Sequence, residues 1–191
     1  MTTRFARPRL LSFAAVPLAL LAACSKADGT VAAAGRSTAG ADLLDRHGKK
    51  VGSALLRQTA AGVEIEMEVS GLTPGVHALH IHTTGDCHTP GPDGTAFAAA
   101  GAHFNPFGKK HGLDNPEGPH AGDLPNFTAA ADGSAKVKVE ARLVTLETGK
   151  PNSLFQPGGT CLVIHEKADD GKTDPAGDSG ERVACGVITR K

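Results

Sequence analysis

A strict alternation of apolar and acidic residues in one short segment constrains the fold of this chain. In residues 62–72, GVEIEMEVSGL, apolar side chains occupy every second position and glutamates stand between them. Because successive side chains of a β-strand point to opposite faces, the pattern predicts a strand with one buried and one solvated face. The 191 residues suffice for one domain with a core, and 24 glycines and 12 prolines without long helical periodicity predict a loop-rich β protein.

Six further segments predict short strands separated by turns that contain glycine or proline. They are residues 39–45, 51–58, 76–82, 134–146, 160–166 and 182–188. Seven or eight short strands predict an all-β sandwich or barrel. Two long segments, 83–133 and 167–181, break this pattern. Loops of such length in a compact domain are usually functional or disordered.

The N-terminal segment differs in composition from the rest of the chain. Basic residues precede the apolar run LLSFAAVPLALL at 10–21, and AAC follows, as in a secretory signal peptide. The run is shorter than the roughly 20 apolar residues that span a membrane. LAAC at 21–24 resembles a bacterial lipobox, which implies a signal peptide over 1–23 and lipidation of Cys24; ordinary cleavage after an incidental sequence is the alternative. Residues 24–37 predict a flexible tether to a domain over 38–191.

Charge and cysteine usage narrow the partners and the compartment. The formal net charge is zero, which gives no reason to expect nucleic acid as a partner. An exported protein meets an oxidising environment, in which disulfides persist. With Cys24 assigned to a lipid anchor, Cys87, Cys161 and Cys185 allow at most one intramolecular disulfide and leave one thiol.

Histidines and one aspartate gather in a few short motifs. In HALHIH, residues 77–82, His80 and His82 share one strand face while Leu79 and Ile81 take the other. The other candidate ligands are His103, His111, His120, Asp123 and His165. Imidazole nitrogens with a carboxylate suit zinc and copper rather than calcium or magnesium. A bound metal would also order the loop at 103–123.

Six motifs, in chain order, resemble those of the copper/zinc superoxide dismutase family over about residues 39–189. They are HIHTTGDC, GAHFNP, KKHG, GPHAGDLPN, VIHEKADD and ERVACGVI. The resemblance implies a Greek-key β-sandwich or barrel of about eight antiparallel strands with two long active-site loops. It further implies dismutation of superoxide to dioxygen and hydrogen peroxide by one copper and one zinc per subunit, and protection of the cell envelope.

The resemblance also assigns roles to individual residues. The implied copper ligands are His80, His82, His103 and His165, and the implied zinc ligands are His103, His111, His120 and Asp123. In this assignment His103 bridges the metals and supports catalysis, Asp169 hydrogen-bonds one ligand histidine of each site, and Arg182 orients the superoxide anion. Cys87 and Cys185 are expected to form a disulfide, with Cys161 a half-buried free thiol.

Alternatives to this assignment stay open at the level of sequence. His77 is expected to support the site through hydrogen bonds, whereas His47 and His88 are expected not to bind metal. A dismutase-like module that binds copper and zinc without turnover would be expected to lack a copper ligand or the arginine. A zinc hydrolase would need an open coordination position. The oligomeric state stays open, with a homodimer as one alternative, and the N-terminus predicts a periplasmic or membrane-anchored location in the cell envelope.

Overall fold

The computed structural model describes residues 1–2 and 37–191, and residues 37–191 form an all-β domain with one short 3-10 helix, η1 (Ala98–Ala100). The strands are β1 (Thr38–Asp45), β2 (Lys50–Gln58), β3 (Val63–Val69), β4 (Gly75–His77), β5 (Leu79–His82), β6 (Phe127–Ala129), β7 (Ala135–Ala141), β8 (Cys161–His165), β9 (Arg182–Val187) and β10 (Thr189–Arg190). The signal peptide predicted over 1–23, the predicted lipidation of Cys24 and the predicted tether at 24–37 fall almost entirely on residues 3–36, which lie outside the described residues. Among the described residues, no helix is long and apolar enough to cross a bilayer.

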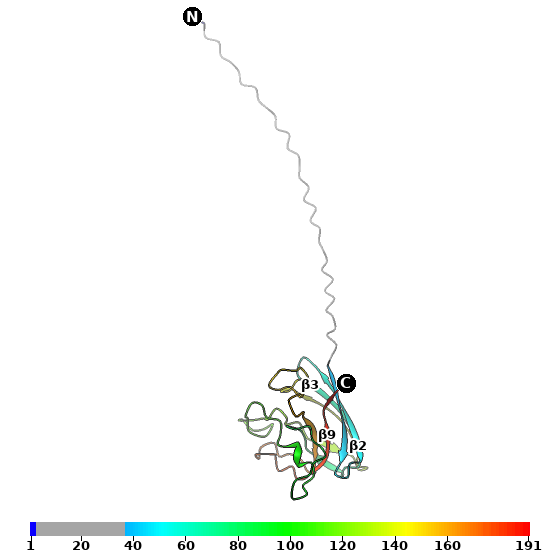
Figure 1. Ribbon diagram of the computed structural model, residues 1–191. Helices are drawn as coiled ribbons and strands as arrows, with labels where there is room; N and C mark the ends of the chain where they lie inside the picture. Colours follow the sequence, from blue (N-terminus) through cyan, green and yellow to red (C-terminus); the bar gives the residue numbers. More distant parts are fainter. Residues whose placement is uncertain (3–36) are drawn as a thin grey trace. The chain divides into compact units, whose positions relative to one another are not determined.

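Eight strands make one curled antiparallel sheet with the order β5-β8-β9-β1-β2-β3-β7, in which β10 also pairs with β1. β4 and β6 form a separate two-stranded sheet. β7 returns to pair with β3 only after the chain has passed through β4, β5 and β6, which is a connection of the Greek-key type. Figure 1 shows β2, β3 and β9 in a curved wall, with the long loops gathered beside it. The predicted all-β Greek-key architecture is confirmed.

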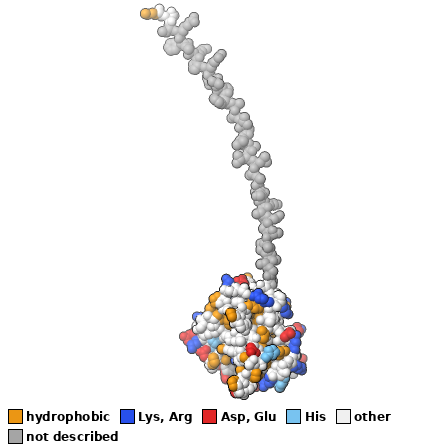
Figure 2. Space-filling view, in the orientation of Figure 1, with side chains coloured by type: hydrophobic (Ala, Val, Ile, Leu, Met, Phe, Trp, Pro, Cys, Tyr) orange, Lys and Arg blue, Asp and Glu red, His pale blue; other side chains and the backbone are white. Residues whose placement is uncertain are grey.

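The alternation in β3 positions the core as predicted. Val63, Ile65 and Met67 are buried, and Ile65 lies opposite Leu56 of β2 and Val139 of β7. Burying a side chain of this size contributes roughly 1.5–3 kcal/mol. The solvated face of the domain instead carries acidic and basic side chains intermixed (Figure 2). The inner face of the sheet is therefore apolar and buried, and packing on this face stabilises the pairing of β3 with β2 and β7.

Besides shifts of up to three residues at strand ends, the strands differ from those predicted in three places. The predicted strand at 76–82 is interrupted at Ala78, whose backbone bonds to Lys167 and His165 while β4 and β5 pair with different partners. The predicted strand at 134–146 ends at Ala141, because its partner β3 begins at Val63, opposite that residue. The segment 83–133 also contains the short strand β6, which pairs with β4.

Candidate metal centre

Strand β5 presents histidines on one face and core residues on the other, as its sequence predicts. His80 and His82 are buried on the loop side, while Leu79 and Ile81 join the hydrophobic core. β8 pairs with one edge of β5, and the loop segments around His103 and Asp123 pair with the other edge. The metal-binding loop is thus held against β5 by backbone hydrogen bonds.

A glycine permits the close approach of that loop. Ile81 N–H donates to the Gly122 carbonyl over 2.9 Å. A Cβ atom at Gly122 would lie 2.3 Å from the Ile81 carbonyl oxygen and 3.0 Å from the Phe104 nitrogen. Such distances are far inside van der Waals contact, so only glycine lets the chain between His120 and Asp123 lie flat against β5.

Four imidazoles converge at one end of β5. One candidate ligand atom from each of His80, His82, His103 and His165 lies within 4.8 Å of all the others. His82 Nδ1–H donates to the Gly101 carbonyl at 2.9 Å, and His165 Nδ1–H donates to the Gly180 carbonyl at 3.2 Å. These outer hydrogen bonds leave the Nε2 atoms of both rings unprotonated and 3.4 Å apart, facing the same point.

Burial keeps three of these rings neutral, those of His80, His82 and His165, as metal ligands must be. It lowers the pKa of His80 to about 4 and the pKa of His165 to about 3, and it also lowers the pKa of His82. For His80, the hydrogen bond to Asp169 opposes this shift without cancelling it. Near neutral pH these three rings therefore offer lone pairs rather than positive charges.

A second group of four donors lies directly beside the first and shares His103 with it. Asp123 Oδ1 lies 2.8 Å, 3.2 Å and 3.4 Å from the Nδ1 atoms of His103, His111 and His120. Burial alone would raise the pKa of Asp123, but hydrogen bonds from His103 and the Gly112 N–H hold that pKa below its ordinary value. The group therefore combines three imidazoles with one ionised carboxylate, a suitable donor set for tetrahedral zinc.

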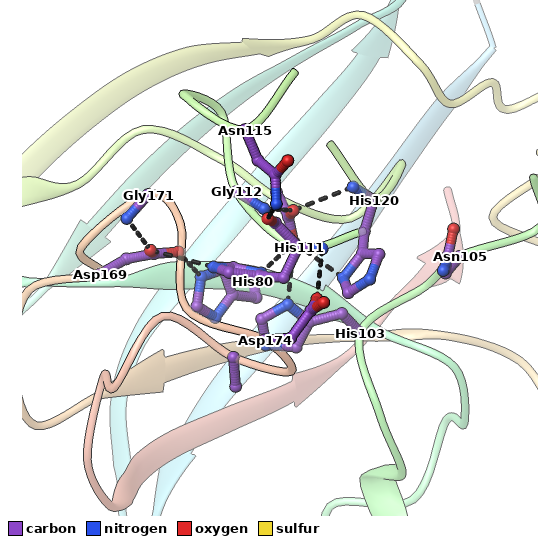
Figure 3. A network of polar contacts seen from close by, with 12 residues as sticks. His80, His103, Asn105, His111, Gly112, Asn115, His120, Asp169, Gly171 and Asp174 are labelled. Atoms are coloured by element: carbon purple, nitrogen blue, oxygen red, sulfur yellow. Dashed lines mark hydrogen bonds and ion pairs between the residues drawn. The ribbon is translucent and has the colours of Figure 1, made fainter. Parts of the chain in front are cut away.

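Asp169 connects the two groups, as Figure 3 shows. Its Oδ2 accepts His80 Nε2–H at 2.7 Å and its Oδ1 accepts His111 Nε2–H at 3.0 Å. Burial would raise the pKa of Asp169, yet the hydrogen bonds from His80, Gly171 and His111 lower it well below the ordinary value. One ionised carboxylate thus fixes the tautomer of one histidine in each group.

Unsatisfied nitrogen atoms test whether these residues fit metal ions. Among the described side chains, His80 Nδ1, His103 Nε2 and His120 Nδ1 are buried and have no hydrogen-bond partner. Leaving a buried polar atom unpaired costs roughly 1–3 kcal/mol, so buried polar groups normally have partners. All three atoms belong to the two convergent groups, and a metal ion in each group would satisfy them. The donor sets fit copper in the all-histidine group and zinc in the group with Asp123.

Arg182 lies at the start of β9 beside the all-histidine group. Its Nη1 donates to the Phe97 carbonyl at 2.6 Å and its Nη2 donates to the Gly101 carbonyl at 2.6 Å. The same Gly101 oxygen accepts the hydrogen bond from His82 Nδ1. A shared acceptor therefore fixes the guanidinium relative to a candidate copper ligand. Nη1 also donates to the Ala98 carbonyl at 3.5 Å, and the Nε–H and the second Nη2–H, which have no partner among the described residues, are available to an anion.

The predicted disulfide between Cys87 and Cys185 is confirmed, with a Cα–Cα distance of 5.5 Å. It ties the loop after β5 to the strand that begins with Arg182. Cys161 is the free cysteine among the described residues. It is completely buried, so the prediction of a half-buried thiol is wrong, and burial raises its pKa to about 12.

Several supporting residues carry no recognisable sequence signal. Asn126 exchanges two hydrogen bonds with the backbone of Asp169, at 2.8 Å and 2.9 Å. Asp174 accepts the backbone N–H of His111 at 2.7 Å. His77 was predicted to support the site, and its two ring nitrogens do lie 2.7 Å and 2.8 Å from the carbonyl oxygens of His165 and Thr73. His47 and His88 are exposed and lie outside both candidate groups.

Fold and site together define a class of protein: a curled antiparallel sheet that carries two adjacent histidine-rich groups that could each hold a metal ion. Residues 50–188 match the family model for copper/zinc superoxide dismutase (SODC), and the chain belongs to that family. It is 52% identical over 149 residues to superoxide dismutase [Cu-Zn] 1 of Aquifex aeolicus, covering 78% of this chain and 85% of that one.

Two solved structures resemble the domain. A SOD-like protein from Bacillus subtilis has a TM-score of 0.72 at 39% identity, with coverage of 78% of this chain and 96% of that one. The Cu/Zn superoxide dismutase from Brucella abortus has a TM-score of 0.65 at 30% identity, with coverage of 79% and 99%. These relatives have the fold described above, which agrees with the assignment to the family.

Proposed function

We propose that this protein converts two superoxide anions and two protons into dioxygen and hydrogen peroxide. Copper, bound by His80, His82, His103 and His165, supplies the one-electron redox chemistry, and zinc, bound by His103, His111, His120 and Asp123, completes the centre with one ion of each metal per subunit. The observation that carries the proposal is the position of Arg182, whose guanidinium and His82 share the Gly101 carbonyl.

Arg182 binds and orients the anion in this scheme. Its charge is permanent, and its backbone hydrogen bonds prevent the guanidinium from following the substrate into solvent. Hydrogen bonds to charged groups contribute about 1.5–3 kcal/mol. The guanidinium therefore raises the rate of substrate capture by roughly 10- to 100-fold.

His103 supplies the proton-transfer atom. Its Nδ1 is directed to Asp123, and its buried Nε2 has no partner among the described residues and faces the all-histidine group. An imidazole nitrogen in this position can take up a proton and return it to the departing peroxide. Asp123 fixes the ring through Nδ1 in the metal-free chain, which leaves Nε2 as the ring atom that can hold the proton.

The N-terminal sequence and the disulfide support a location in the cell envelope. We infer export, removal of residues 1–23 and lipid anchoring at Cys24 from the N-terminal sequence pattern. The Cys87–Cys185 disulfide supports an oxidising compartment. The tether at 24–37 would hold the domain near a membrane in the cell envelope, where it would remove superoxide. A homodimer stays a prediction that analytical ultracentrifugation would test.

Superoxide decay measured on the copper- and zinc-loaded chain tests the activity. The wild type is expected to accelerate decay, and Arg182→Ala to lose about 10- to 100-fold at unchanged metal content. Arg142→Ala, which removes an exposed arginine from outside the site, is the matched control. Baseline decay by wild type with full copper occupancy would instead support a non-catalytic metal-binding module. Ester hydrolysis by the zinc-only form would support a hydrolase.

A further inference from the structure

Three sulfur atoms form a compact cluster that shares no residue with the histidine groups. The Sγ atoms of Cys87, Cys161 and Cys185 lie within 4.8 Å of one another. Cys161 comes from β8 and Cys185 from the neighbouring β9, while Cys87 follows β5 in the loop. The disulfide uses two of these sulfurs, and the third has no role in the dismutation chemistry proposed above.

The surroundings of the cluster are apolar. Phe97, Ala100 and Val163 are buried against the three cysteines. The candidate metal-ligand atoms of this cluster are all sulfur, and thiolates are soft ligands that select soft metal ions such as monovalent copper. Oxygen-seeking cations such as calcium and magnesium have no matching donor set here.

The strand register places the sulfurs on the same sheet face as the candidate copper ligands. Cys161 lies directly opposite His82, and Val163 lies between His80 on one side and Cys185 on the other. Residues directly opposite in an antiparallel pair share a face, with Cβ atoms about 4.5–5.5 Å apart. The thiol of Cys161 is therefore an immediate neighbour of His82.

A positive charge borders the cluster as well. Arg182 Nη1 donates to the carbonyl of Phe97, which packs against the sulfurs. Three thiolates around a monovalent ion carry a net charge of about minus two, and a fixed guanidinium close by offsets part of it. The cluster thus combines soft donors, buried apolar neighbours and a compensating cation.

We propose that the three cysteines bind one monovalent copper ion when the Cys87–Cys185 disulfide is reduced. A phosphine reductant and water convert the disulfide to two thiols and leave the phosphine oxide. Three thiols then bind Cu⁺ through sulfur and release three protons to solvent. Three donors match monovalent copper better than zinc, whose structural sites almost always have four ligands. Oxidation back to the disulfide would remove two of the donors.

Anaerobic titration of Cu⁺ against a competing chelator tests the site on the full chain. Cys24→Ala serves as the background, since it removes the thiol that lies outside the cluster. The reduced chain is expected to bind one more equivalent of Cu⁺ than the oxidised chain, with sulfur neighbours in the copper X-ray absorption spectrum. Cys161→Ala is expected to lose that equivalent, whereas Val163→Ala, a truncation in the same cluster, is expected to keep it.

Circular dichroism and the uptake of zinc by the histidine group report whether each variant is folded. The proposal is overturned if the reduced chain takes up no additional Cu⁺, including the case in which reduction unfolds it. It is equally overturned if folded Cys161→Ala retains the additional sulfur-bound equivalent. Dismutase activity of the oxidised chain is measured separately, so failure of the sulfur site leaves the proposed enzymatic function untouched.

Discussion

Replacement of Asp169 by asparagine isolates the residue that connects the two candidate metal groups. The carboxylate accepts one imidazole N–H from His80 and one from His111, at 2.7 Å and 3.0 Å. An amide has the same shape but offers one acceptor oxygen, and its NH₂ group would face an N–H of the other ring. That ring must then move its proton to the nitrogen that faces the metal, or turn away.

The size of the effect follows from these two contacts. A hydrogen bond to a charged group contributes about 1.5–3 kcal/mol, and loss of such outer-shell partners typically weakens metal binding by about 10- to 100-fold. Because the amide satisfies only one ring, Asp169→Asn is expected to weaken copper or zinc, or both, by that factor. Chelator competition for each metal measures it.

Asp170→Asn is the matched control for this substitution. Asp170 is the adjacent exposed carboxylate, and its oxygen accepts the backbone N–H groups of Lys172 and Thr173, a role that an asparagine oxygen also fills. The control is expected to bind both metals as the wild type does. Wild-type affinity for both metals in folded Asp169→Asn would refute the assigned role of the carboxylate.

Two further perturbations act on the buried histidines and on the disulfide. Metal-free protein is expected to lose stability as the pH falls below about 6.5 toward about 4 and 3, the lowered pKa values of His80 and His165, because the unfolded state binds protons that the folded state resists. Urea midpoints at pH 8 and pH 5 measure this, and a higher midpoint at pH 5 would contradict it. Cys87→Ser combined with Cys185→Ser opens a link across 98 residues and is expected to lower the free energy of unfolding by about 2–5 kcal/mol; a loss under 1 kcal/mol would contradict the expectation.

Strands with a clear periodic pattern were predictable, and strands defined by tertiary pairing were not. β3 carries its alternation within its own sequence and is buried accordingly. β6 has three residues, too few to show a period, and exists because Gly75–His77 pairs with it. The break at Ala78 arises since the chain changes partners there, which depends on residues near position 165 that are remote in sequence.

The candidate site likewise contains residues that the sequence predicted and contacts that it could not predict. Strand alternation predicted that His80 and His82 share a face, and the resemblance to the family implied which other side chains join them. The carbonyls of Gly101 and Gly180 and the side chain of Asn126 could not be predicted, since each acts through a backbone contact that only the folded chain creates. Complete burial of Cys161 likewise follows from the loop that packs over β8, which local hydropathy does not encode.

Anomalous diffraction from crystals of the copper- and zinc-loaded chain, recorded at both metal absorption edges, tests the central claim most directly. The expected result is a copper peak among His80, His82, His103 and His165 and a separate zinc peak beside Asp123, with His103 between the two. A single metal position, zinc in both positions, or copper ligated away from His80 and His82 would contradict the proposed centre and the dismutation that depends on it.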